Sequence, residues 1–334
     1  MIYKKNIIVT GGAGFLGVHL CERLLHEANV ICIDNFVTSK ESNINHLLKS
    51  QNFAFINHDS SKAIDLETVK DLEKFQIDIF GISEIYNLAC PMSVKNFAKY
   101  KIESVLSNTD GLINALNLAV KYKSKFMQFS TSVVYGDVPK GEFVREDYRG
   151  LLDMMDPRAC YDVGKFYAES VVENYREKYS LDTKIIRIFR TYGPYMLIDD
   201  GQMICDFVID ALNNKNLTIY GGEEFITSLC YVSDIIDGCV KLMATDFHEP
   251  MNIGSTFVYK MADVAQKIIE LTNSNSRVTF EKEQLFMRQL AFPDVTLIKE
   301  KIGWFPIVTL DDGLQKTVDF IRAHKDLLNF STSI

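Results

Sequence analysis

Two side chains four residues apart, Tyr161 and Lys165, have the types and spacing needed for proton transfer. On a helix, positions i and i+4 share a face and lie about 5–6 Å apart. A lysine charge at that position favours the phenolate and lowers a tyrosine pKa from about 10 towards the working pH. Such a tyrosine can take a proton from a hydroxyl group. The same pair is common on solvated helices, so its meaning depends on the surrounding elements.

Three hydroxyl side chains, Ser130, Thr131 and Ser132, directly follow the apolar run 126–129, which predicts a strand. We predict that Thr131 hydrogen-bonds the reacting oxygen and shares its proton with Tyr161. The alternative is that these hydroxyls only satisfy backbone groups where the strand ends. The residues alone leave both interpretations open.

The glycines Gly11, Gly14 and Gly17 follow a predicted strand at 6–10 and open a predicted helix. Bare backbone at this turn lets a pyrophosphate approach closely, and the helix N-terminus supplies free N–H groups. Asp34 ends the next strand, about 20 residues beyond Gly14. Its carboxylate can accept both ribose hydroxyls of NAD and would repel a 2′-phosphate. A structural turn with a surface aspartate is the alternative, but strand, turn, helix and acid together favour NAD.

Further residues of the predicted NAD site come from the same turns and strand ends. Asp59 either holds the adenine side or caps the end of a strand. The complete predicted set is Gly11, Gly14, Phe15, Leu16, Gly17, Asp34, Asn35, Asp59, Ser60, Leu88, Ala89, Tyr161 and Lys165.

The elements that must position these residues alternate between strand and helix. Apolar runs predict strands at 6–10, 30–33, 53–56, 85–88, 126–129 and 185–188. Continuous apolar strands with helical crossovers indicate a parallel sheet covered on both faces. The second half predicts helices near 202–213, 233–244, 261–272 and 311–324, and short strands near 217–220, 251–253 and 278–281. We therefore expect an α/β fold: a Rossmann-type doubly wound domain, residues 1–190, interwoven with a smaller C-terminal α/β substrate lobe, residues 191–334.

Composition excludes several classes of protein. The 334 residues are 47% hydrophobic and 24% charged, which is typical of a globular chain and excludes disorder. The net charge of -8 argues against nucleic acid or an anionic membrane as a partner. Seven cysteines without a CxxC pair predict buried reduced thiols, and the six histidines lack the spacing of a metal site. The chain begins directly with a strand-like run and lacks an apolar stretch of about 20 residues, so we expect a cytoplasmic protein.

Several longer motifs extend this pattern over nearly the whole chain. With them the chain resembles an extended short-chain dehydrogenase/reductase, most closely the UDP-glucuronate decarboxylase branch of nucleotide-sugar enzymes. The motifs that carry the resemblance occupy residues 10–17, 87–91, 130–136, 157–161, 187–189, 191–194, 198–201 and 230–234.

The resemblance implies NAD in the first domain and a nucleotide-linked sugar in the C-terminal lobe. It implies Thr131, Tyr161 and Lys165 as the catalytic set, with Tyr161 as the base for oxidation at C4 and Lys165 also binding the nicotinamide ribose. It further implies a homodimer through helices near 100–121 and 158–179. The apolar stripe of the earlier helix (Val105, Leu112, Leu116, Val120) fits either a dimer bundle or the core.

The sequence departs from the family at positions where other members carry catalytic acids or arginines that bind the diphosphate. Decarboxylases and dehydratases of the family carry Glu where this chain has Val133, and dehydratases carry Asp at Ser132. Arg190 replaces a usual Asn, whereas Tyr195, Thr227 and Ala291 replace usual arginines. Bidentate arginine contacts to phosphate are strong, so another cation (Arg190, Lys215 or Arg288) is expected to supply the charge, unless Arg190 is only a surface or salt-bridge residue. The predicted substrate-binding residues are Ser132, Val133, Arg190, Tyr195, Lys215, Tyr220, Thr227 and Arg288.

These departures order the functional hypotheses. Because Val133 cannot carry a proton, a 4-epimerase or 4-dehydrogenase acting on a hexose or heptose nucleotide is the first expectation. UDP-glucuronate decarboxylation is the alternative that overall similarity favours. A third hypothesis is a retired enzyme that keeps NAD and acts by binding a partner, which the lost phosphate clamps would permit.

Overall fold

The computed structural model describes residues 4–93, 96–198, 200–282 and 290–329. Its centre is a parallel sheet of seven strands in the order β12-β7-β5-β4-β1-β2-β3. Six of these strands lie where the apolar runs predict them. Their bounds are β1 Asn6–Thr10, β2 Asn29–Asp34, β3 Phe53–Asn57, β4 Glu84–Asn87, β5 Lys125–Thr131, β7 Thr183–Ile188 and β12 Met251–Ile253.

The strand order is that of a Rossmann-type sheet, so the predicted fold class is confirmed. The order reverses between β1 and β4, and ligands of such sheets bind outside the carboxyl ends of the strands at that point. The short run 251–253 was expected only as a strand of the second half. It is the edge strand of the main sheet, because Met251 pairs with Ile186 of β7.

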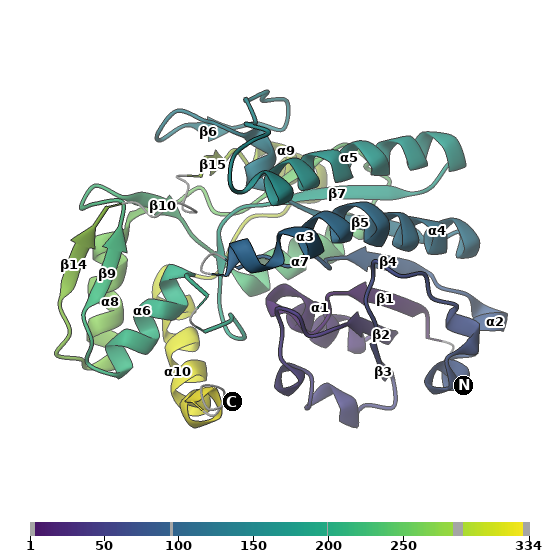
Figure 1. The fold of residues 1–334 in the computed structure, drawn as a ribbon, viewed down its shortest axis with the longest axis horizontal. Helices are drawn as coiled ribbons and strands as arrows, with labels where there is room; N and C mark the ends of the chain where they lie inside the picture. The colour runs from purple at the N-terminus through teal and green to yellow at the C-terminus, as the bar shows by residue number, and fades with distance from the viewer. Residues whose placement is uncertain (1–3, 94–95, 199, 283–289, 330–334) are drawn as a thin grey trace.

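Helices cover both faces of the sheet (Figure 1), and neighbouring residues of a strand pack into two different cores. Ile7 and Val9 of β1 join one core, whereas Ile8 joins the other. The first core includes residues of α1 Phe15–Leu25 and α7 Val232–Met243, and the second includes residues of α4 Leu112–Tyr122 and α5 Ala159–Tyr179. Burial on both faces is the reason that these strands are continuously apolar.

The helix expected near 100–121 is divided into α3 Lys101–Leu106, a π turn over Ser107–Gly111, and α4. Leu112 and Leu116 of its apolar stripe are fully buried in the core beneath the sheet, whereas Val105 is exposed. The buried pair therefore serves the core. The homodimer through α3, α4 and α5 stays a prediction.

A second group of elements lies beside the carboxyl ends of the strands, apart from the sheet (Figure 1). It includes α6 Met203–Leu212, α8 Met261–Thr272 and α10 Leu310–Asn329, close to the predicted helices. Two-stranded ladders join β9 Leu217–Tyr220 to β14 Val278–Glu281 and β10 Ile226–Ser228 to β13 Val258–Lys260. Because α7 and β12 return to the sheet, the chain passes between the two parts more than once, and the boundary at residue 190 stays a prediction.

The remaining elements are short, and they lie in the connections between the longer helices and strands. They include α2 Ile77–Phe80, β6 Phe143–Val144, β8 Thr191–Tyr192, β11 Cys230–Tyr231, β15 Phe292–Pro293 and α9 Thr296–Ile302. All seven cysteines are free thiols, and five of them are buried, as expected. Across the described helices, none combines the length and apolar character needed to cross a membrane.

Candidate active site

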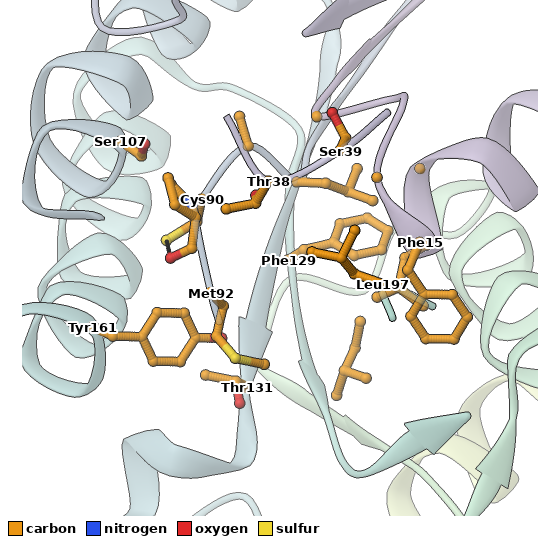
Figure 2. A pocket seen from close by; sticks show the side chains of 18 of the residues that line it. Phe15, Thr38, Ser39, Cys90, Met92, Ser107, Phe129, Thr131, Tyr161 and Leu197 are labelled. Carbon is orange, nitrogen blue, oxygen red and sulfur yellow. Dashed lines mark hydrogen bonds between the residues drawn. The ribbon is translucent and has the colours of Figure 1, made fainter. Parts of the chain in front are cut away.

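A cavity of about 610 Å³ opens at the carboxyl ends of the central strands, where the strand order reverses. It is lined both by turns of the Rossmann domain and by segments that lead into the C-terminal lobe. Figure 2 shows Tyr161 reaching from its helix towards Thr131 and Met92, with Phe15 and Leu197 elsewhere in the same cavity. The predicted residues that line it are Gly11, Gly14, Phe15, Leu16, Gly17, Asp34, Asn35, Asp59, Ser60, Leu88, Ala89, Thr131, Ser132, Val133, Tyr161, Lys165, Arg190 and Tyr195.

The glycine turn between β1 and α1 has no room for side chains. Gly11 has a φ of +69°, and a Cβ there would lie 2.9 Å from the backbone nitrogen of Ala89. A Cβ on Gly17 would lie 2.2 Å from the carbonyl oxygen of Gly11. The backbone at the start of α1 is therefore bare and faces the cavity, which is the arrangement that a dinucleotide pyrophosphate requires.

Asp34 at the end of β2 is held in place by donors from neighbouring loops. Its Oδ2 accepts a hydrogen bond from the Ala13 N–H at 3.0 Å, and its Oδ1 accepts from the Phe36 N–H at 2.9 Å and the Ser39 hydroxyl at 2.8 Å. A fixed carboxylate beside the glycine turn fits the ribose of NAD, as predicted. The residues present thus fit a dinucleotide at both its pyrophosphate and its ribose.

Asp59 follows β3 and also accepts hydrogen bonds within its own turn. The N–H and the hydroxyl of Ser61 both donate to its Oδ1, at 3.0 Å and 2.8 Å. Burial raises the pKa of this carboxyl, but the hydrogen bonds from Ser61 outweigh burial and hold it below its ordinary value. Asp59 therefore caps a turn and lines the cavity at the same time, so the two interpretations are compatible.

The predicted catalytic residues converge at one end of the cavity. Tyr161 lies in the first turn of α5 and Thr131 ends β5, and the Thr131 hydroxyl is near enough to the phenol to lower the pKa of Tyr161. Lys165 is buried, and its Nζ donates to the carbonyl oxygen of Phe129 at 2.9 Å. The backbone of β5 thus fixes Lys165 one helical turn from Tyr161.

The charge environment of Tyr161 differs from the expectation. Burial raises the pKa of its phenol well above the ordinary value, and nearby Cys90 and Asp162 add to this effect. Arg158 and the hydrogen bond with Thr131 act in the opposite direction. Lys165 Nζ lies 6.0 Å from the centre of the phenol ring. Arg158, one turn before Tyr161, is a second cation near the phenol. In the sequence it stood out only as a member of the motif 157–161, with no predicted role.

A buried polar network behind the catalytic end was not predicted. The Ser130 hydroxyl donates to Glu169 at 2.5 Å, and Arg187 of β7 forms an ion pair with Glu169 at 2.7 Å. Arg187 also donates to the Tyr135 hydroxyl at 3.0 Å, which donates to Asn252 at 2.5 Å. The network ties α5 to strands β5, β7 and β12. It could not be read from spacing, because its members lie far apart in the sequence.

The wall of the cavity next to Tyr161 is apolar. Val133 packs with Phe97 and Tyr161 in a small cluster, together with partly buried Met92 and Leu290. Ser132 is buried, and its hydroxyl has no hydrogen-bond partner among the described residues. An uncharged wall therefore replaces the acid that the family carries at Val133.

Three predicted substrate residues are not brought to the cavity. Lys215 is exposed before β9, Tyr220 is half-buried at the end of β9, and the Thr227 hydroxyl donates to the Ser228 carbonyl oxygen at 3.2 Å. None of these three lines the cavity, although Leu229 and Met261, which directly follow β10 and β13, do. Arg288 falls outside the described residues.

Tyr195 lies at the entrance to the lobe and joins several elements. Its ring packs at 5.3 Å from the imidazole of His19, at 5.9 Å from His46 and at 4.5 Å from Phe320 of α10. Its hydroxyl lies 3.5 Å from Glu22 of α1. Tyr195 thus connects the Rossmann domain to the lobe at a position where the family carries an arginine.

Other cavity residues were missed by sequence reasoning. Thr38, Ser39 and Asn43 follow β2, and the Asn43 amide donates to the Ala13 carbonyl oxygen at 2.9 Å. Met261 and Gln202 come from the lobe side. The position of Asn43 offered a weak signal, since it lies within the loop after the predicted ribose-binding acid. Nowhere in the described parts of the chain do three or more metal-binding side chains gather.

This fold and site define a dinucleotide-binding protein of the extended short-chain dehydrogenase/reductase class. The sequence pattern of the GDP-mannose 4,6 dehydratase family matches residues 8–317, and the chain belongs to that family. It is 35% identical over 320 residues to UDP-glucuronic acid decarboxylase 1 of Xenopus tropicalis, covering 96% of this chain and 72% of that protein. It is 36% identical over 318 residues to UDP-glucuronic acid decarboxylase 4 of Arabidopsis thaliana, covering 95% and 68%.

Solved structures agree with this family assignment. UDP-glucuronic acid 4-epimerase from Bacillus cereus, in complex with UDP-glucuronic acid and NAD, has a TM-score of 0.80 at 27% identity, covering 95% of this chain and 99% of that one. UDP-glucose 4-epimerase from Thermotoga maritima, with UDP-glucose, has a TM-score of 0.83 at 25% identity, covering 96% and 99%. The resemblance drawn from the motifs is confirmed.

Proposed function

We propose that this protein uses NAD to oxidise the C4 hydroxyl of a nucleotide-linked sugar. The observation that carries the proposal is the meeting of Tyr161 and Thr131 in the same cavity as the bare glycine turn. The family match supports it, because relatives and neighbours are named for reactions of nucleotide sugars and one neighbour contains NAD.

The residues of this chain have separate tasks in that reaction. When bound, NAD supplies the oxidant that accepts a hydride from C4 and can return it. Tyr161 Oη takes the proton of the C4 hydroxyl, and Thr131 stabilises the phenolate by hydrogen bonding. Arg158 favours the same ionised form. Lys165, fixed by Phe129, is placed to hold the nicotinamide ribose.

For the net reaction we propose decarboxylation of a UDP-linked glucuronic acid, which the relatives favour over the 4-epimerase that Val133 alone suggested. Oxidation at C4 makes the sugar a β-keto acid. The C5–C6 bond then breaks, its electron pair moves into an enolate on the C4 oxygen, and carbon dioxide leaves. A proton must afterwards reach C5, and return of the hydride to C4, with a proton on the C4 oxygen, would then complete the UDP-pentose. No acid at position 133 is needed for the bond to break, so Val133 is compatible with decarboxylation.

A 4-epimerase is the second candidate, and the apolar wall of Val133, Phe97 and Tyr161 favours it. In an epimerase the ketone is reduced again from the other face, and no acid is needed at position 133. The Bacillus cereus neighbour is named as a 4-epimerase of UDP-glucuronic acid. The two candidates therefore share a substrate and an oxidation step, and they differ in the fate of the 4-keto sugar.

One product assay separates these reactions. Purified protein is incubated with NAD and UDP-glucuronic acid, and products are identified by NMR and mass spectrometry together with released carbon dioxide. A UDP-pentose with equimolar carbon dioxide supports decarboxylation, whereas UDP-galacturonic acid without carbon dioxide supports the epimerase. If neither UDP-glucuronic acid nor neutral UDP-hexoses are converted, the enzymatic proposal is wrong and the retired binding protein takes its place.

A further inference from the structure

Arg190 is a cation that lines the cavity and has no anionic partner among the described residues. It follows β7, and its backbone carbonyl accepts from the Cys230 N–H at 3.0 Å, which fixes the residue between the sheet and the lobe. Its guanidinium lines the cavity at 6.0 Å from the Phe225 ring. A planar guanidinium at this position can present several donors to a bound oxyanion.

The described residues provide Arg190 with no anionic partner. Its Nε is buried and makes no hydrogen bond among them. Two of the carboxylates that line the cavity, Asp34 and Asp59, are occupied by donors of their own turns. Burial, followed by the repulsion of Arg158, lowers the pKa of Arg190 to about 10, so the group still carries its charge at neutral pH. A buried charge of this kind is stable only when something compensates it.

Arg158 differs from Arg190 in having a partner within the protein. Its Nη2 lies 3.4 Å from Asp162, and its guanidinium lies 5.7 Å from the Phe97 ring. Arg158 is thereby held beside Tyr161, whereas Arg190 is directed by packing alone. Of the two, Arg190 is the cation that a ligand can engage without displacing an ion pair.

We infer that Arg190 anchors an oxyanion group of the sugar nucleotide, and that it thereby replaces the phosphate clamps that Tyr195 and Thr227 no longer provide. The inference rests on the proposed function, since it assumes a sugar nucleotide in this cavity. The group engaged is either the sugar carboxylate or the diphosphate, because both offer paired oxygens to a guanidinium. Tyr195 and Thr227 are uncharged, so neither replaces the charge of the arginines that the family carries at these positions. The Tyr195 ring packs against other rings, and the Thr227 hydroxyl donates a hydrogen bond to the Ser228 carbonyl oxygen.

The test is a binding measurement that does not depend on turnover. Calorimetric titrations of UDP-glucuronic acid, UDP-glucose and UDP are made with NAD-loaded wild type and Arg190→Gln. If Arg190 binds the carboxylate, affinity for UDP-glucuronic acid falls on the order of 10- to 100-fold and the other two change less than about twofold. If it binds the diphosphate, all three affinities fall by a similar factor. Equal affinities in wild type and variant would overturn the inference.

Two further variants keep the result interpretable. Arg277→Gln removes an exposed arginine of the lobe that does not line the cavity, and it should bind all three ligands like wild type. Arg190→Lys keeps the charge and loses the planar fork, so it should bind with intermediate affinity and serves if Arg190→Gln does not fold. If wild type binds none of the ligands, the proposed function fails with the inference. If wild type binds and both Arg190 variants bind equally well, only the inference fails.

Discussion

The cofactor half and the substrate half of the cavity are built by different means. The cofactor half is built mainly from backbone at the ends of neighbouring strands, such as the glycine turn after β1, and backbone N–H groups hold the Asp34 carboxylate at the end of β2. The substrate half uses side chains from distant segments, among them Arg158, Arg190 and Tyr195. A site made of backbone depends on the fold itself, whereas a site made of side chains can change by single substitutions. The family departures that line the cavity, Ser132, Val133, Arg190 and Tyr195, fall in the second half.

Tyr161 lies where the two halves meet, and its loss should have the largest effect. Tyr161→Phe removes the proton acceptor while the buried ring remains, so we expect kcat to fall by about 10²- to 10⁴-fold with the fold intact. Steady-state kinetics with UDP-glucuronic acid measure the loss, and circular dichroism checks the fold. Tyr167→Phe, which removes a phenol hydroxyl from an exposed position on the same helix, is the control. Equal rates in wild type and Tyr161→Phe would remove Tyr161 from the chemistry.

Gly17→Ala should damage the cofactor half selectively. The added Cβ would lie 2.2 Å from the Gly11 carbonyl oxygen and 2.6 Å from the Gly12 Cα, and backbone at both points cannot move without opening the turn. Overpacking of this kind costs about 1–3 kcal/mol, so NAD affinity should fall roughly 10- to 100-fold. Titration of NAD with each protein measures this effect.

The matched control for that substitution is Gly303→Ala. Unlike Gly17, Gly303 has a positive φ, of +66°, and an added Cβ there would meet nothing within 4 Å. It should therefore change stability modestly and leave NAD affinity unchanged. If both variants weaken NAD binding equally, the close backbone contacts of Gly17 are not what the cofactor half requires.

Tyr195→Ala tests whether the substrate half depends on side-chain packing between the two parts of the chain. The substitution removes ring contacts with His19, His46 and Phe320. For a half-buried ring we expect a loss of about 1–3 kcal/mol and a melting temperature lower by a few degrees, measured by calorimetry. Phe257→Ala removes an exposed ring and should leave the melting temperature unchanged. An unchanged melting temperature for Tyr195→Ala would mean that Tyr195 does not connect the two parts.

The contrast between the halves also explains what the sequence could predict. Strands 6–10 and 126–129 and the residues that follow them were placed correctly, because periodicity and local spacing define a strand, a turn and a helix start. β12 was not assigned to the main sheet, because three residues carry too little pattern and its partner β7 lies far away in the sequence. Periodicity and local spacing thus predict where a strand ends, but they do not predict which distant strands pair.

The same limit applies to individual side chains. Lys215 and Tyr220 were chosen by residue type within the lobe, and type alone does not say which way a strand of the lobe faces. The ion pair of Glu169 with Arg187 could not be predicted from the sequence, because it joins a helix to a strand by a tertiary contact. Arg190 was found for a different reason: it departs from a motif whose place at the end of a strand is fixed.

Thr131→Val should have the smallest effect and should depend on pH. The Thr131 hydroxyl favours the ionised phenol of Tyr161, so its removal raises the pKa of Tyr161 further above the ordinary value. Because the phenolate is the active base, the rising limb of the kcat profile moves to higher pH, and kcat near neutral pH falls roughly two- to tenfold. Well below the pKa of Tyr161 the loss should stay constant, and it should shrink only as the pH approaches that pKa, where phenolate forms in both proteins. Thr279→Val, in the lobe strand β14, should leave the profile unchanged. A loss that persists unchanged at pH values where the wild-type rate has already levelled off would show that Thr131 acts on the substrate and not through the ionisation of Tyr161.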